Sequence, residues 1–163
     1  MKCLIISDTH GNEYGVREVL SMHRDCEIVF FLGDGLSDIE ELAYHDRERT
    51  WVCVRGNCDM RPLFCGGPVE KVEQISVAGK KIVITHGHEY AAKWGTDALR
   101  YLAESREADI VLFGHTHMPY EEYINDPKPL YLFNPGALSS PTFSYGILRL
   151  EGGNVLFSHG GRA

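Results

Sequence analysis

Two histidines separated by one residue follow a short apolar run late in the chain. The run is Asp109–Phe113, and Gly114 separates it from His115 and His117. The run predicts a buried strand, and alternate residues just beyond its end can point the same way. Gly114 lets the backbone turn and approach other atoms closely, because it has no Cβ. Two surface imidazoles would fit the same spacing, so the pair alone leaves metal binding open.

Five further polar side chains occupy equivalent places, at or just beyond the end of a predicted strand. They are Asp8, His10, Asp34, Asn57 and His86. The carboxyl ends of strands in α/β sheets share one edge, where ligands collect. We therefore expect these five side chains to converge with the two histidines in one crevice.

Together the side chains offer oxygen and nitrogen donors and require no thiolate. That mixture suits Mn²⁺, Fe, Zn²⁺ or Ni²⁺ and is poor for Ca²⁺. The set is too large for one tetrahedral ion, but a bridging carboxylate would divide it into two sites. Two cations about 3.5–4 Å apart can acidify a shared water and neutralise charge on a phosphate. The set therefore predicts a pair of divalent metal ions and hydrolysis of a phosphate ester.

Length and composition describe an ordinary globular chain of 163 residues, 44% hydrophobic and 24% charged. We expect a single domain over residues 1–163. The net charge of −7, without a Lys/Arg-rich block, argues against a duplex nucleic-acid partner.

No targeting or framework signal stands out. No apolar run is long enough for a transmembrane helix, and the N-terminal run is too short for a signal peptide. We therefore expect a cytoplasmic protein with no membrane partner. The 5 cysteines include no C-x-x-C motif, so neither a disulfide framework nor a zinc ribbon is predicted.

Hydrophobic periodicity predicts strands that alternate with helices in the first third of the chain. The expected strands cover residues 2–7, 27–32 and 50–55, and the expected helices cover residues 14–24 and 37–45. Connections of this length permit parallel pairing. Residues 61–68, rich in Gly and Pro, predict a loop.

The rest of the chain contains more strands than helices. Strands are expected at residues 69–77, 80–85, 109–113, 120–124, 130–133, 144–150 and 154–158. One helix is expected over residues 92–107, carrying Trp94, Ala98, Tyr101 and Leu102. We expect one sheet built by crossover helices and another built by hairpins. The predicted fold is α/β: a four-layer α-β-β-α sandwich of two mixed β-sheets flanked by helices.

In this order the polar motifs resemble those of the calcineurin-like metallophosphoesterases. The matching motifs are Asp8-x-His10, Gly33-Asp34, Gly56-Asn57, His86 and Gly114-His115-x-His117. Each is weak alone, but five in order at strand ends are specific. The short chain and the segments 7–12 and 56–59 look most like the small prokaryotic phosphodiesterase branch of that family.

The resemblance implies a binuclear metal centre and the metallophosphoesterase fold. The first metal would be held by Asp8, His10 and His117, and the second by Asn57, His86 and His115. Asp34 would bridge them. The implied ions are two divalent transition metals, with Mn²⁺ first and Ni²⁺, Fe, Zn²⁺ or Co²⁺ as alternatives. The implied reaction is attack of a metal-bound hydroxide on phosphorus, with Asp34, Asn57, Cys58 and His115 as candidate catalytic residues.

Cys58 departs from the pattern, because many family members carry a histidine there as general acid or transition-state stabiliser. A neutral thiol is a weak donor with a reference pKa of about 8.5. Loss of an acid–base group typically costs on the order of 10²–10⁴ in rate. The loss matters least when the leaving group is good. We therefore predict weak action on phosphomonoesters and better action on diesters with acidic leaving groups, such as aryl phosphodiesters.

Several other polar residues have two interpretations. His88 would contact substrate, or lie behind the ligands or on the surface. Asn12 would cap a helix rather than touch substrate. Asp38 would orient a ligand or complement a helix N-terminus. The segment Asn134–Gly136 resembles a family loop near the metals but predicts a turn first, and His23 and His45 are expected to be structural.

The leading hypothesis is a phosphodiesterase that acts on a small phosphate-ester substrate. One alternative is a phosphomonoesterase or nucleotidase, against which Cys58 argues. The other is a non-catalytic scaffold of the same fold, for which the eukaryotic retromer subunit that resembles this family is the precedent. A scaffold would have lost ligand positions, whereas all of them are present here. A homodimer or homotetramer is compatible with the resemblance.

Overall fold

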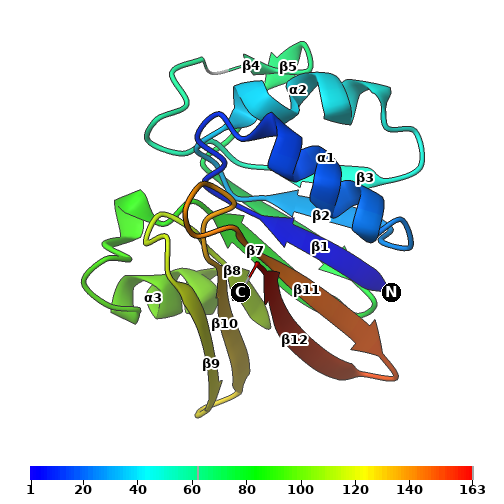
Figure 1. The fold of residues 1–163 in the computed structure, drawn as a ribbon. Coiled ribbons are helices and arrows are strands. Elements are labelled where there is room, and N and C mark those ends of the chain that lie inside the picture. The colour runs from blue at the N-terminus through cyan, green and yellow to red at the C-terminus, as the bar shows by residue number, and fades with distance from the viewer. Residues whose placement is uncertain (62, 163) are drawn as a thin grey trace.

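Two five-stranded sheets and three α-helices make up most of the computed structural model, which describes residues 1–61 and 63–162 (Figure 1). The first sheet has the order β12-β11-β1-β2-β3. Its strands are β1 (Lys2–Ile6), β2 (Ile28–Phe31), β3 (Thr50–Cys53), β11 (Ser144–Glu151) and β12 (Asn154–Gly161). The second sheet has the order β6-β7-β8-β10-β9. Its strands are β6 (Val72–Val77), β7 (Lys80–Thr85), β8 (Ile110–Leu112), β9 (Pro119–Asn125) and β10 (Pro129–Pro135).

The central strands are apolar runs because both of their faces are buried. In β1, Cys3 and Ile5 face the second sheet, whereas Leu4 and Ile6 pack under the helices of the first. This alternation follows from the two-residue period of a strand. A strand that is covered on both sides shows no polar positions between its apolar ones, which is why periodicity located it.

The second sheet repeats this arrangement with a helix on its own outer face. Ile82 and Ile84 of β7 belong to the core between the sheets. Val83 packs with Leu99 and Leu102 of α3 (Asp97–Arg106) instead. Two layers of strands therefore share one core, and each has a helical cover.

Helices α1 (Glu13–Met22) and α2 (Leu36–His45) cover the first sheet, and α3 lies on the far side of the second (Figure 1). The expected cap of α1 is confirmed, since Asn12 Oδ1 accepts a hydrogen bond of 3.0 Å from the Gly15 amide. The predicted four-layer α-β-β-α sandwich is therefore confirmed. None of the helices in the described ranges is long and apolar enough to cross a membrane.

The expected division into a crossover-built sheet and a hairpin-built sheet is wrong. The hairpin β11–β12 joins the first sheet, where β11 pairs antiparallel with β1. Tyr145 and Ile147 pack toward the helices, and Leu148 and Leu150 pack between the sheets. Because both faces of β11 are apolar, it covers the open edge of β1. In the second sheet β8 pairs in parallel with β7 and β10, so both sheets are mixed.

The helix expected over residues 92–107 begins only at Asp97. Ala91 and Gly95 have φ of 51° and 150°, which interrupts helical geometry before that point. A short 3₁₀ turn, η1 (His88–Tyr90), precedes the break. Trp94 and Tyr101, expected on the helix, are 91% and 72% exposed. The helix instead buries Leu99, Leu102 and Ala103.

The loop expected over residues 61–68 contains a two-stranded hairpin. Its strands are β4 (Leu63–Phe64) and β5 (Gly67–Pro68). Cys65 and Gly66 between them have φ of 50° and 80°, as tight hairpin turns require. A pattern this short carries no alternation from which a strand could be predicted.

Candidate metal centre

The side chains that the sequence singles out come together at one edge of the two sheets. They lie on the loops that follow β1, β2, β3, β7 and β8, at the carboxyl ends of these strands. Asp8, His10 and His117 bring ligand atoms within 4.8 Å of one another, and so do Asp34, His86 and His115. The loop after β3 contributes Asn57, whose Oδ1 lies 3.0 Å from His86 Nε2.

Potential metal-ligand atoms lie very close together in the first of these groups. The Nε2 atoms of His10 and His117 are 3.2 Å apart. Asp8 Oδ1 lies 3.1 Å from His117 Nε2 and 3.7 Å from His10 Nε2. This oxygen is buried, and no hydrogen bond from the described residues reaches it. Because a bare buried carboxylate oxygen is costly, the arrangement fits a cation among these three side chains.

The second group has its ligand atoms oriented from behind. His86 Nδ1 lies 2.7 Å from the Leu32 carbonyl oxygen. A carbonyl can only accept, so this nitrogen carries a proton, and Nε2 is the atom that would bind a metal ion. His86 Nε2 lies 3.3 Å from Asp34 Oδ2. Burial and the charge of His86 lower the pKa of His115, which keeps that imidazole neutral and available as a ligand.

Asp34 lies between the two groups. Its Oδ2 is 3.3 Å from His86 Nε2 and 4.0 Å from His10 Nε2. Its Oδ1 accepts a hydrogen bond of 2.7 Å from the Cys58 amide. The residues present therefore fit a pair of divalent cations with one carboxylate between them.

Backbone strain is concentrated at these positions. Asp8, His10, Asp34, His115 and His117 have φ of 54°, 43°, 59°, 68° and 60°. A non-glycine residue in this left-handed region costs roughly 1–2 kcal/mol. Such residues persist where the surrounding structure over-determines them, most often at functional sites. The strain marks this edge as selected for the placement of side chains rather than for stability.

Two glycines allow the strand ends to approach this closely. A Cβ at Gly114 would lie 2.0 Å from Ser7 Oγ and 2.8 Å from Asp8 Oδ2. A Cβ at Gly56 would lie 2.1 Å from Asp34 Oδ1. Any larger residue would displace a carboxylate, so these motif glycines serve close packing of the centre.

Asp59 holds two of the loops together, a role that the sequence did not reveal. Its Oδ2 accepts hydrogen bonds from the amides of Asp34 and Gly56, at 2.7 and 2.8 Å. Its Oδ1 accepts from Gly35 and Leu36, both at 2.9 Å. One carboxylate thus satisfies the start of α2 and fixes the loop of Asp34. Only its place in the motif after Asn57 could have signalled it.

Two further residues support the loops from behind. Asp38 Oδ2 accepts hydrogen bonds from Thr9 Oγ1 and from the Gly11 amide, so it braces both sides of His10. Asn134, expected in a turn, instead lies in β10 and is buried. Its Nδ2 donates to the Gly114 carbonyl and to Thr116 Oγ1, at 2.9 and 3.0 Å. It therefore orients the loop that carries His115 and His117.

The remaining histidines differ in their relation to the centre. His88 lies beside the second group, with its ring centroid 5.4 Å from His86 and 6.0 Å from His115. His23 lies 3.0 Å from the Tyr145 hydroxyl, in keeping with the structural role expected for it. His45 ends α2 and lies outside the centre, next to the Tyr44 ring.

Cys58 is exposed at the centre, and its Sγ lies 3.5 Å from Asn57 Nδ2. Burial of part of the side chain and the neighbouring Asp34 carboxylate raise the pKa of the Cys58 thiol. The thiol is therefore neutral at pH 7 and carries no charge to the centre.

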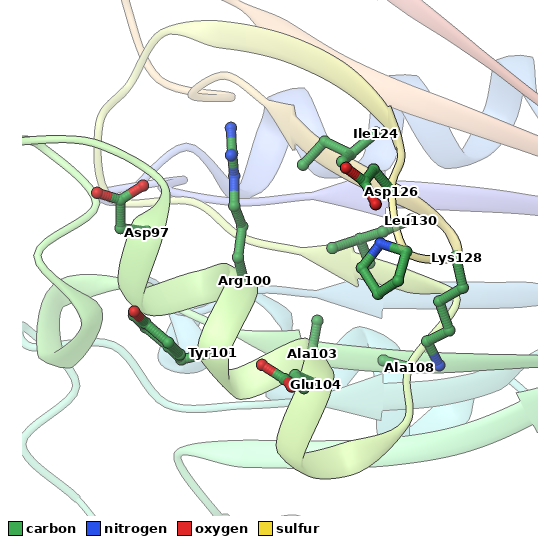
Figure 2. Close-up of a pocket in the computed structure, with 11 residues that line it drawn as sticks. Asp97, Arg100, Tyr101, Ala103, Glu104, Ala108, Ile124, Asp126, Lys128 and Leu130 are labelled. Atoms are coloured by element: carbon green, nitrogen blue, oxygen red, sulfur yellow. The ribbon is translucent and has the colours of Figure 1, made fainter.

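A separate hollow of about 430 Å³ lies between α3 and the β9–β10 turn (Figure 2). Its lining includes Arg100, Glu104 and Lys128 but none of the metal-site candidates. Arg100 is bound to Glu122 at 2.6 Å. The hollow therefore offers no converging ligand atoms and no chemistry comparable to that of the sheet edge.

Comparison with known proteins gives consistent matches. Residues 1–153 match the calcineurin-like phosphoesterase superfamily domain. The probable metallophosphoesterase YsnB of Bacillus subtilis is 34% identical over 156 residues, covering 93% of this chain and 85% of that protein. The structure of an archaeal phosphodiesterase matches with a TM-score of 0.75 and 24% identity, covering 98% and 99% of the two chains. Vacuolar Protein Sorting 29 of Cryptosporidium parvum matches with a TM-score of 0.73 and 19% identity, covering 99% and 98%. At these identities the two structures show a shared fold alone.

Replacing Asp59 by Asn should weaken metal binding. An amide keeps one acceptor oxygen and turns an NH₂ toward two amide donors, so two of the four hydrogen bonds are lost. We expect Mn²⁺ affinity to fall about 10–100-fold in calorimetric titration. Asp25→Asn, at an exposed aspartate bound to Lys2, is the control and should change nothing. Unchanged affinity in Asp59→Asn would show that the carboxylate serves folding only.

The metal-free protein should be most stable in mildly acidic solution. Burial opposes ionisation of Asp34, but the hydrogen bond and charge of His86 outweigh it and hold the pKa below its ordinary 3.8. Burial likewise opposes protonation of His86, but Asp34 and Asp8 raise its pKa above 6.5. The aspartate contributes stability above pH 3.8 that is lost in acid. The histidine contributes stability below pH 6.5 that is lost as pH rises.

Urea unfolding in the presence of a chelator tests this dependence. From pH 5 to pH 8 the wild type should lose more stability than His86→Gln, which has no group to titrate. Saturating metal should reverse the trend, because ligand imidazoles must be neutral to bind. Equal losses in wild type and His86→Gln would contradict the assignment of this ion pair.

Proposed function

Since the chain belongs to the calcineurin-like phosphoesterase superfamily, we propose that it is a binuclear metal-dependent phosphodiesterase that hydrolyses small phosphate diesters. The observation that carries the proposal is the position of Asp34 between two groups of ligand atoms. A single-ion site would need no carboxylate in that position. Metallophosphoesterase relatives and a phosphodiesterase of the same fold support it.

Each group would hold one ion. Asp8, His10 and His117 would bind the first, and Asn57, His86 and His115 the second, with Asp34 bridging. Mn²⁺ is the first candidate, and Ni²⁺, Fe, Zn²⁺ and Co²⁺ fit the same donors. When bound, the two cations would polarise the phosphoryl group and lower the pKa of a water between them.

The protein's own groups would then position the ester. Asn57 is exposed, and its Nδ2 remains a donor while its oxygen faces His86. This amide would hold an oxygen of the phosphate. The neutral thiol of Cys58 would leave the departing oxygen without a strong proton donor. The reaction is therefore favoured for esters whose leaving group departs readily as an anion.

The same reasoning weighs the alternatives. A phosphomonoesterase would face a dianionic substrate, and Cys58 supplies no positive charge to it. A scaffold is compatible with the fold, which Vacuolar Protein Sorting 29 shares. However, strained backbone at five ligand positions is costly to maintain without a ligand. The enzyme proposal accounts for this cost, whereas a scaffold that binds no metal does not.

Metal titration combined with two substrates tests the proposal. Protein stripped of metal should hydrolyse neither an aryl phosphodiester nor an aryl phosphomonoester. Added Mn²⁺ should bind at two ions per chain and restore hydrolysis, with the diester preferred. Asp34→Asn should lose both ions and lower activity by more than about 10²-fold, because electrostatic stabilisation is lost, whereas Asp25→Asn should match the wild type. If the protein bound no divalent ion and showed no activity, the proposal that it is an enzyme would be refuted.

Cys58→His should add turnover of monoesters. An imidazolium at this position would bring a positive charge and a proton to the leaving oxygen, which a thiol cannot do. We expect monoester hydrolysis to rise by up to about 10²-fold, while hydrolysis of a nitrophenyl diester changes little. Cys58→Ser is the matched control, since a hydroxyl brings no charge and should give no gain. Equal monoester rates in all three proteins would show that the missing acid is not what limits them.

A further inference from the structure

Two hollows with different linings adjoin the metal centre. One, of about 470 Å³, is polar and lies beside the first ligand group, lined by Thr9, His10, Gly11, Asn12, His117, Ser139 and Ser140. The other, of about 230 Å³, lies beside Cys58, and its lining includes Leu36, Met60, Arg61 and Leu63. A phosphodiester carries two ester groups, here called its arms. The centre lies next to one hollow for each of them, and the two hollows differ in their linings.

The hollow beside Cys58 has apolar side chains on part of its wall, and two of them, Met60 and Leu63, are exposed. Leu36 is 5% exposed and belongs to the core under α2. Met60 and Leu63 are 87% and 55% exposed. Large apolar side chains gathered at the rim of a hollow indicate a binding site rather than ordinary surface. Met60 is suited to this, because a thioether adapts its shape and packs well against aromatic rings.

Charge and size restrict the occupant. The charged groups of the lining are Glu40, Arg61 and Asp59. Arg61 is bound to Glu40 at 3.0 Å, and the Asp59 oxygens already accept four amides. No free cation among the described lining residues is left to attract a second phosphate. The volume is below the roughly 300–1,000 Å³ of sites that enclose whole ligands, so it suits one arm.

We propose that the hollow formed by Leu36, Cys58, Met60 and Leu63 binds a neutral aromatic arm of the diester. This inference rests on the proposed function, because Cys58 joins the hollow to the reaction centre. The substrate class is thereby narrowed to diesters that carry at least one aromatic group. The polar hollow beside His10 and His117 receives the other arm.

Phosphonates test the hollow without relying on turnover. Phenylphosphonate and methylphosphonate share the phosphonate head group and differ in the group bonded to phosphorus, a phenyl ring or a methyl group. Calorimetry on Mn²⁺-loaded wild type should show phenylphosphonate binding about tenfold more tightly, from burial of the ring. Met60→Ser combined with Leu63→Ser should remove that preference and leave methylphosphonate binding unchanged. Both residues are exposed, so the double variant should fold.

Controls separate this proposal from its rivals and from its premise. Leu156→Ser, at a 58% exposed leucine of β12, should keep the preference. No preference in wild type, or an equal preference in the double variant, would overturn the aromatic arm. A wild-type dimer that the double variant dissociates, with phosphonate binding unaltered, would assign the surface to a second copy and also overturn it. If the preference is lost as expected but no diester is hydrolysed, the hollow stands and the phosphodiesterase proposal fails.

Discussion

A buried carboxylate and two imidazoles held close together at one sheet edge are the constraint on which the structure depends. Asp8 Oδ1 and the Nε2 atoms of His10 and His117 converge, and no hydrogen bond from the described residues reaches the aspartate oxygen. In such a cluster, a buried carboxylate oxygen without a hydrogen bond is costly until a cation enters. Holding the cluster open requires rigid supports, and the two sheets supply them through a shared core. The left-handed backbone at the ligand positions shows that the loops follow the cluster rather than their own preferences.

The supports behind the ligands are mostly bonds from side chain to backbone. Asp59 binds four amides, Asp38 braces the loop of His10, and Asn134 fixes the loop of His115. Asp59 ties the loops that follow β2 and β3, Asp38 ties α2 to the loop after β1, and Asn134 ties β10 to the loop after β8. This coupling explains how a small chain maintains a strained centre. Three polar residues connect the ligand-bearing loops to the rest of the fold through hydrogen bonds, in place of a large hydrophobic packing around the loops.

The sequence predicted the features that depend on burial and on the order of the motifs. It missed the features that depend on which strand pairs with which, or on which groups a side chain hydrogen-bonds. Strands buried on both faces are continuous apolar runs, so the four layers and the convergence of Asp34 with His86 could be anticipated. The pairing of β11 with β1 could not be anticipated, because a strand with two apolar faces fits either sheet. The role of Asp59 could not be anticipated either, because its partners are backbone amides, which every residue except proline has. The late start of α3 follows from the positive φ of Ala91 and Gly95. Alanine rarely adopts this conformation, so the sequence at Ala91 did not signal the break.

The thiol at Cys58 and the apolar hollow beside it are consistent with one another in chemical terms. A centre that cannot donate a strong proton depends on esters whose leaving oxygen is already acidic, and aromatic alcohols provide this acidity. An apolar wall of Met60 and Leu63 selects the same groups by burial rather than by charge. Substrate choice and the missing acid thus favour the same class of ester. Restoring an imidazole without altering the wall would separate the two effects, because proton donation acts on the leaving oxygen and the wall acts on the ring.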